Sequence, residues 1–84
     1  MEKTIEKLQN KFPLMWFKDG ADFSSMHTDT IWTGEGSYIG DANAFDYYGY
    51  GNTLGIHPTF QKELDKLGLF AEFYDAGTIF LYKV

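Results

Sequence analysis

The 84-residue sequence contains neither cysteine nor arginine. Without cysteine the chain has no disulfide bond, no thiolate metal ligand and no cysteine nucleophile. Arginine is the usual residue for bidentate contacts to phosphates and base edges, and cationic side chains supply most of the affinity for nucleic acids. The absence of arginine therefore argues against direct binding of nucleic acid.

Long apolar runs are also missing. The opening residues, MEKTIEKLQNKF, carry a charge every few positions and lack the continuous apolar stretch of a signal peptide or membrane anchor. We therefore expect a cytoplasmic protein that does not interact with a membrane.

Lysine is unevenly distributed along the chain. The first 18 residues carry four lysines against two glutamates, whereas residues 19–61 carry six carboxylates and no lysine. The six are Asp19, Asp22, Asp29, Glu35, Asp41 and Asp46. A surface formed by such a segment attracts basic proteins and repels nucleic acid.

The composition, 44% hydrophobic and 19% aromatic, is that of a single packed domain spanning residues 1–84. Apolar residues at helical spacing, with Pro13 just beyond them, predict a helix over residues 2–11. A second helix is predicted over 58–67, because Pro58 suits a first helical turn and Gly68 suits a left-handed C-terminal cap.

The C-terminal residues 69–83 predict a β-hairpin with a three-residue loop at 75–77. If Tyr74 pairs with Thr78, one face carries the core residues and the other an aromatic surface. The core face consists of Leu69, Ala71, Phe73, Ile79 and Leu81, and the aromatic face of Phe70, Glu72, Tyr74, Phe80 and Tyr82. The aromatic face is either covered by another element or open to a partner.

The middle of the chain predicts shorter strands. We expect strands at PLMWFK (13–18), at TDTIWT (28–33) with SYIG (37–40) as its hairpin partner, and at AFDYY (44–48), with turns at 19–20 and 41–43. The fold class expected is α+β, with an antiparallel sheet of four or five strands and two helices mainly on one face.

The residue types of catalytic and metal sites occur without a recognised spacing. Ser24, Ser25, His27 and Asp29 include the residue types of a hydrolase triad, and His57 is a further possible ligand. Triads and metal centres are defined by convergent geometry, which neighbouring residues rarely supply. We expect no enzyme activity, no metal and no cofactor.

The segment AFDYYGYGN (44–52) places four aromatic rings around one carboxylate. Tyrosines are frequent anchors in protein interfaces, and carboxylates steer basic partners toward them. The predicted partner-binding residues are Glu35, Tyr38, Asp41, Asp46, Tyr48 and Tyr50. In the alternative interpretation, Phe45 and Tyr47 fill the core and the other side chains form its solvated rim.

In size and charge the sequence is similar to small inhibitors that phages and mobile elements encode against host defence enzymes, including anti-CRISPR and DNA-mimicking proteins. The features shared are a short, acidic chain without cysteine or catalytic motifs. The resemblance implies a non-enzymatic, viral-type inhibitor whose carboxylates replace phosphates in the groove of a basic nucleic-acid-handling partner. Two alternatives remain: a subunit that forms a homodimer through the aromatic face, and a small-ligand-binding domain or enzyme, which requires a pocket with converging polar groups.

Overall fold

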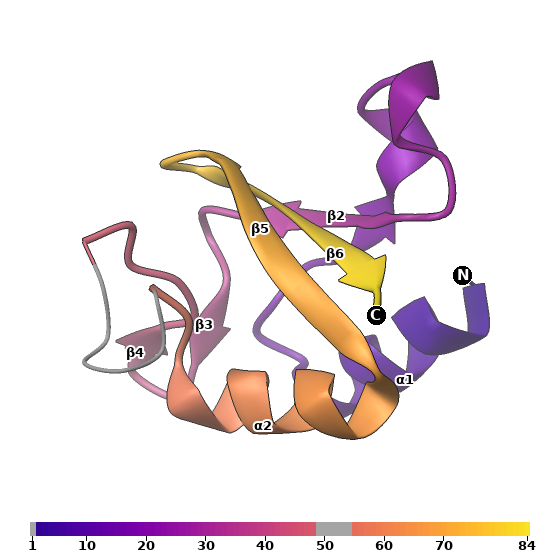
Figure 1. Cartoon of the computed structure of the whole chain (residues 1–84). Helices are drawn as coiled ribbons and strands as arrows, with labels where there is room; N and C mark the ends of the chain where they lie inside the picture. The colour runs from indigo at the N-terminus through magenta and orange to yellow at the C-terminus, as the bar shows by residue number, and fades with distance from the viewer. Residues whose placement is uncertain (1, 49–54) are drawn as a thin grey trace.

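The computed structural model describes residues 2–48 and 55–84 and shows a small α+β domain (Figure 1). Its larger sheet is antiparallel and four-stranded, in the order β1-β2-β6-β5, and its smaller sheet pairs β3 with β4. The elements are α1 (Glu2–Lys11), β1 (Lys18–Asp19), β2 (Ile31–Gly34), β3 (Tyr38–Ile39), β4 (Ala42–Asn43), α2 (Pro58–Leu67), β5 (Leu69–Asp75) and β6 (Thr78–Lys83), with short 3-10 helices η1 (Gly20–Asp22) and η2 (Ser25–His27). The predicted fold class is confirmed.

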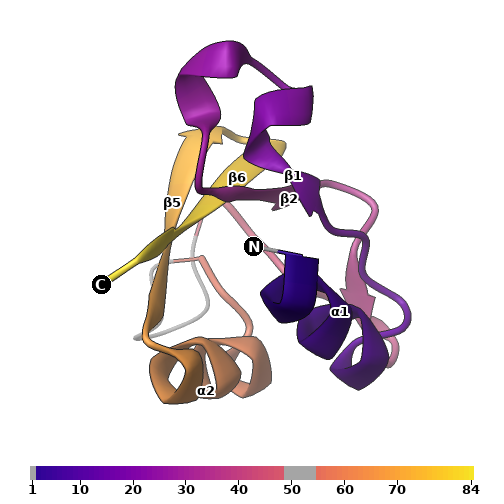
Figure 2. The same cartoon turned by 90° about the vertical axis from the view of Figure 1, so that its right-hand side faces the viewer.

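Both α-helices lie on one side of the four-stranded sheet, and the η1–η2 segment lies on the other (Figure 2). Between helices and sheet, the large apolar side chains that are fully buried are Leu8, Ile31, Phe60, Leu64, Ile79 and Leu81. Phe12 at the end of α1 meets Phe60 of α2 edge to face, with ring centroids 5.2 Å apart. None of the helices in the described part of the chain is long and apolar enough to cross a membrane.

The two helices have the predicted bounds because their end signals are local. In α2, the His57 ring nitrogen accepts the backbone N–H of Thr59, Pro58 occupies the first turn, and Gly68 ends the helix in the left-handed conformation (φ 69°). Glycine is favoured there because a Cβ makes this conformation costly.

Replacing Gly68 with alanine tests this cap. A Cβ at Gly68 would meet no heavy atom within 4 Å, so the cost is conformational, and we expect the free energy of unfolding to fall by about 1–2 kcal/mol in urea titrations. Gly68→Asn, whose side chain tolerates the left-handed region, is the control and should lose less. Equal losses for both variants would contradict the explanation.

The hairpin is confirmed, and its register is as predicted for most of its length. Residues pair from Leu69↔Lys83 to Phe73↔Ile79, which places the predicted core residues together on the helix side. Near the turn, an irregularity between Phe73 and Asp75 sets Asp75, not Tyr74, opposite Thr78. The turn therefore contains two residues, and the Asp75 carboxylate stabilises it by accepting the N–H of Gly77 at 2.9 Å.

The strand expected at 13–18 is wrong except at its end. Met15 and Phe17 are buried, but the backbone turns at this point, where the Met15 N–H donates to Phe12 O at 3.1 Å. Pairing begins only at Lys18, opposite Trp32. The apolar residues of this run thus fill the core from an irregular segment.

Two further predictions for the middle are also wrong. SYIG (37–40) is not the hairpin partner of β2, because β1 and β6 occupy both edges of that strand. Its residues Tyr38 and Ile39 instead pair with Asn43 and Ala42, so part of the turn expected at 41–43 is strand. In segment 44–48, Phe45 alone bridges to Ile56, and no strand forms.

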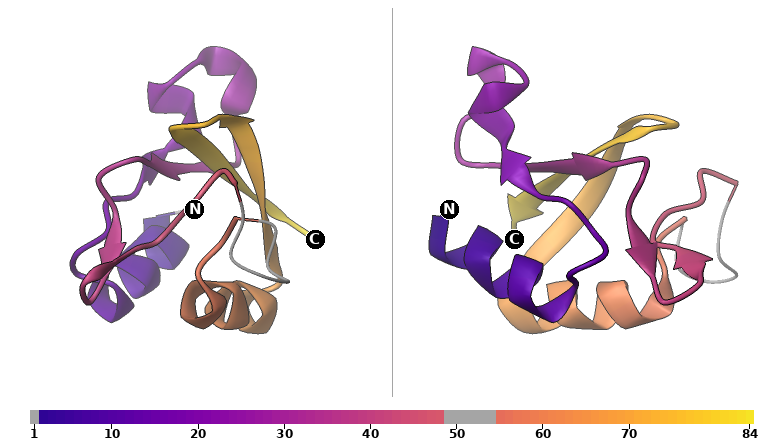
Figure 3. Two further views of the ribbon diagram at one scale, coloured as in Figure 1. Left: turned by 90° about the vertical axis from the view of Figure 1, so that its left-hand side faces the viewer. Right: turned by 180° about the vertical axis from the view of Figure 1, so that it is seen from behind.

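The aromatic face of the sheet is partly covered. Phe80 is 1% exposed because two rings cover it. The His27 ring stacks on it with ring centroids 4.0 Å apart, and the Phe23 ring contacts it edge-on with centroids 5.2 Å apart. The two views in Figure 3 show the covering η1–η2 segment above the sheet. Phe70 and Tyr74 remain exposed at 42% and 59%.

Candidate functional site

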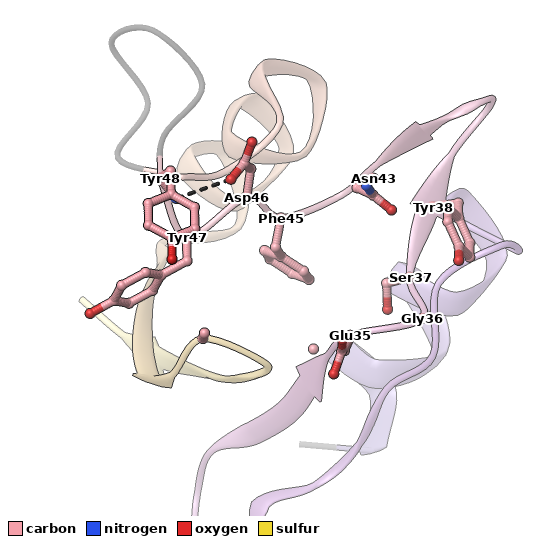
Figure 4. A pocket seen from close by; sticks show the side chains of 11 residues that line it. Glu35, Gly36, Ser37, Tyr38, Asn43, Phe45, Asp46, Tyr47 and Tyr48 are labelled. Atoms are coloured by element: carbon pink, nitrogen blue, oxygen red, sulfur yellow. Dashed lines mark hydrogen bonds between the residues drawn. The ribbon is translucent and has the colours of Figure 1, made fainter.

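A cavity of about 410 Å³ lies where the β2–β3 connection, the segment after β4 and the β5–β6 turn meet (Figure 4). Four aromatic rings, two carboxylates and several small or polar residues line it. They are Tyr38, Phe45, Tyr47 and Tyr48; Glu35 and Asp46; and Gly34, Gly36, Ser37, Asn43 and Ala76. The cavity thus joins Glu35, Tyr38, Asp46 and Tyr48, four of the six predicted partner-binding residues.

The other two predicted residues are placed differently. Asp41 is exposed at the turn between β3 and β4 and is not part of the lining. Tyr50 lies outside the described residues. Tyr47 was not among the predicted site residues, although it is 56% exposed and lines the cavity.

The tyrosine-rich segment divides between core and surface at Phe45. Phe45 packs edge-on against Phe60 and Phe73, with centroids 5.6 and 6.4 Å apart. Tyr47 and Tyr48 are 56% and 94% exposed, and the Tyr47 ring contacts Phe73 and Tyr48 from outside. The alternative of a core-filling pair is therefore right for Phe45 and wrong for Tyr47.

The first wall of the cavity is held by hydrogen bonds to the irregular segment after α1. The Tyr38 N–H donates to Leu14 O at 3.1 Å, and the Trp16 indole N–H donates to Glu35 O at 2.7 Å. The buried Thr33 hydroxyl donates to Trp16 O at 2.6 Å. These bonds fix the backbone at both Glu35 and Tyr38.

The second wall is the segment that carries Asp46. The Asp46 N–H donates to Gly55 O at 2.7 Å, and an Asp46 carboxylate oxygen accepts the Tyr48 N–H at 3.0 Å, as Figure 4 shows. Gly55 has a φ of 90°, and a Cβ there would press against Asp46 O and the Phe73 ring. The close approach of these two backbones therefore requires glycine.

The third wall is the β5–β6 turn, joined to the first by a hydrogen bond from the Glu35 N–H to Gly77 O at 3.0 Å. Ala76 of this turn lines the cavity. No lysine is among the described residues of the lining; five of the seven lysines lie on α1 and α2. The local charge is therefore negative.

The acidic middle of the chain nevertheless forms two regions. Glu35 and Asp46 are at the cavity, whereas Asp22 and Asp29 belong to the η1–η2 segment and its exit, beyond the opposite end of β2 (Figure 1). The lysine-free segment does not present one continuous acidic surface.

Three of the residues with catalytic or metal-binding chemistry make local contacts or turns. The Ser24 hydroxyl oxygen accepts the Met26 N–H at 3.2 Å, and the His27 ring lies flat on Phe80. Asp29 adopts a left-handed turn conformation (φ 59°). Within residues 2–48 and 55–84, no three histidine or carboxylate side chains are grouped as metal ligands.

Comparisons of the chain with protein-family models, curated proteins and solved structures find no match. Its function is therefore inferred from the site alone.

Thr33→Val tests the support beneath the cavity. Valine has nearly the shape of threonine but leaves the carbonyl of Trp16 without its buried donor. We therefore expect the free energy of unfolding, measured in urea, to fall by about 1–3 kcal/mol. Thr28→Val, at an exposed position, is the matched control and should change stability by less than about 0.5 kcal/mol. Similar losses in both variants would exclude a supporting role for the Thr33 hydroxyl.

Proposed function

We propose that the 84-residue chain is a non-enzymatic inhibitor of a nucleic-acid-handling partner. Its cavity and the tyrosines that line it bind the basic surface of that partner. The observation that carries the proposal is the meeting of Glu35, Tyr38, Asp46 and Tyr48, from separate segments, around one cavity lined by no lysine among its described residues.

The two residue types at the cavity have complementary effects. Carboxylates attract a basic surface over distances near the Debye length, about 8–10 Å at physiological salt. Exposed tyrosines then contribute area that is removed from water on contact, at a small cost in side-chain entropy. Tyr38, Tyr47 and Tyr48 are all at least 46% exposed before a partner binds.

The layout of the carboxylates favours a large partner. Figure 4 shows Glu35 and Asp46 on different walls, with their side chains pointing in different directions. A small ligand that binds both would need them to converge, whereas a protein surface with several lysines or arginines can meet each separately. The carboxylates then occupy positions that nucleic-acid phosphates take on such a partner, as in DNA-mimicking and anti-CRISPR proteins. The proposed location is the cytoplasm, where such partners act.

Neutralising the two carboxylates tests the proposal. Glu35→Gln with Asp46→Asn keeps both shapes and the acceptor for the Tyr48 N–H, and we expect affinity for the partner to fall about tenfold or more, with a weaker dependence on salt. The partner is first isolated by affinity capture from host lysate with and without competing DNA, and dissociation constants are then measured.

The matched control is Glu6→Gln with Asp22→Asn, which changes the net charge equally at exposed positions away from the cavity. It should bind as the unmodified protein does. Equal weakening in both double variants would show a dependence on net charge alone and would refute recognition at the cavity.

A second candidate function is self-association through the aromatic face. Phe70 is 42% exposed and stacks on Tyr82 at 5.3 Å, which leaves an apolar area at one end of the sheet. The η1–η2 segment covers Phe80, however, and so removes this ring from the face that a second copy could contact.

Sedimentation equilibrium distinguishes the two candidates. With the face partly covered, we expect a monomer at micromolar concentration, and Phe70→Ser should leave the sedimenting mass unchanged. A dimer that dissociates in Phe70→Ser would instead support the second candidate.

A further inference from the structure

A second, smaller cavity of about 180 Å³ shares Tyr38 with the acidic one. Its lining is mainly apolar and comes from the segment after α1 and from β3. The residues are Phe12, Pro13, Leu14, Tyr38, Ile39 and Gly40, with Lys11 from the end of α1. A single exposed tyrosine thus stands between an acidic cavity and an apolar groove.

Two large apolar side chains are exposed at this groove. Leu14 is 57% exposed and Tyr38 is 46% exposed, and the hydrogen bond from the Tyr38 N–H to Leu14 O holds their backbones together. The Gln9 side chain also donates to Met15 O at 2.7 Å. The groove therefore exists before a partner arrives, which reduces the ordering cost of binding.

The charges at the two cavities differ. Among the described residues that line the groove, Lys11 alone is charged, and its ammonium lies 3.3 Å from the Glu63 carboxylate on α2. The groove therefore adds no attraction for a cation, whereas the cavity beyond Tyr38 carries Glu35 and Asp46. An apolar side chain suits the groove and a cationic one suits the cavity.

We infer that the binding surface continues from the acidic cavity across Tyr38 into this groove, and that the partner inserts an apolar side chain there next to its cationic ones. This inference rests on the proposed function, because the acidic cavity identifies the partner as basic. The groove then restricts the partner to basic segments that also carry an aliphatic or aromatic residue. It supplies a short-range contact that salt does not screen.

Two synthetic peptides of equal charge test the inference. Each has twelve residues; one alternates arginine with leucine, and the other alternates arginine with serine. Dissociation constants are measured for the unmodified protein, for Leu14→Ser and for Met26→Ser by fluorescence anisotropy. Met26 is 89% exposed on the η1–η2 segment and lines neither cavity, so it is the matched control for loss of an exposed apolar residue.

The leucine peptide should bind the unmodified protein about tenfold more tightly than the serine peptide. In Leu14→Ser this ratio should fall at least about threefold, and in Met26→Ser it should stay the same. Circular dichroism checks that both variants fold, as expected for exposed positions. An unchanged ratio in Leu14→Ser, or an equal fall in both variants, would overturn the inference.

The serine peptide separates this inference from the proposed function. Its affinity should fall in Glu35→Gln with Asp46→Asn but not in Leu14→Ser, because it has no apolar side chain for the groove. If the double variant binds the serine peptide unchanged, the acidic cavity does not attract cations, and the proposed function fails whatever the leucine peptide does.

Discussion

The pairing of β2 with β6 is the interaction on which the site depends. Ile31 pairs with Leu81 and Gly34 with Thr78, so the end of β2 arrives beside the β5–β6 turn. The chain then continues the contact, since the Glu35 N–H donates to Gly77 O. Without this pairing, the β2–β3 connection would not be held beside the β5–β6 turn, and two of the three cavity walls would not be fixed relative to each other. The local sequence signals for the helices and the hairpin would be unchanged.

The elements that the sequence predicted well are those whose signals are local. Pro58 and Gly68 mark the ends of α2, and the hairpin joins strands separated by two residues. The strand β2 was also recognisable from Ile31 and Trp32, but its partners were not. Its main partner lies more than forty residues further along the chain, and no periodicity encodes such a pairing.

The failures in the middle have a common physical cause. A continuous apolar run indicates burial but not backbone conformation, so Met15 and Phe17 reach the core from an irregular segment. Segment 44–48 likewise needs no strand, because Ala44 is buried, Phe45 packs against the core, and the single bridge from Phe45 to Ile56 fixes the backbone. In this part of the domain, single side chains reach the core from irregular segments and not from one face of a regular strand.

The candidate site was visible in the sequence as residue types and charge, but not as a shape. The lysine-free segment 19–61 contributes Glu35 and Asp46 to one cavity, but its sequence did not indicate that Asp22 and Asp29 lie elsewhere. The alternative interpretation placed Tyr47 in the core together with Phe45, and a strand was expected at 44–48. Because no strand forms there, side chains do not alternate between two faces, and the Tyr47 ring lies over Phe73 on the surface.

The aromatic residues of this chain therefore perform two tasks. Phe23, His27 and Phe80 contact one another and cover part of the outer face of the sheet, which adds buried apolar area to the small core of an 84-residue chain. Tyr38, Tyr47 and Tyr48 are held by backbone hydrogen bonds or ring contacts while their side chains stay exposed. Exposed rings cost solvation free energy in the unbound protein, and a fixed backbone keeps them from collapsing onto the core.

In the proposed complex, the carboxylates chiefly raise the rate of encounter, and these rings with Leu14 slow dissociation. Selectivity among basic proteins then comes from the apolar contacts, because many proteins carry positive charge and fewer carry it beside a side chain that fits the groove.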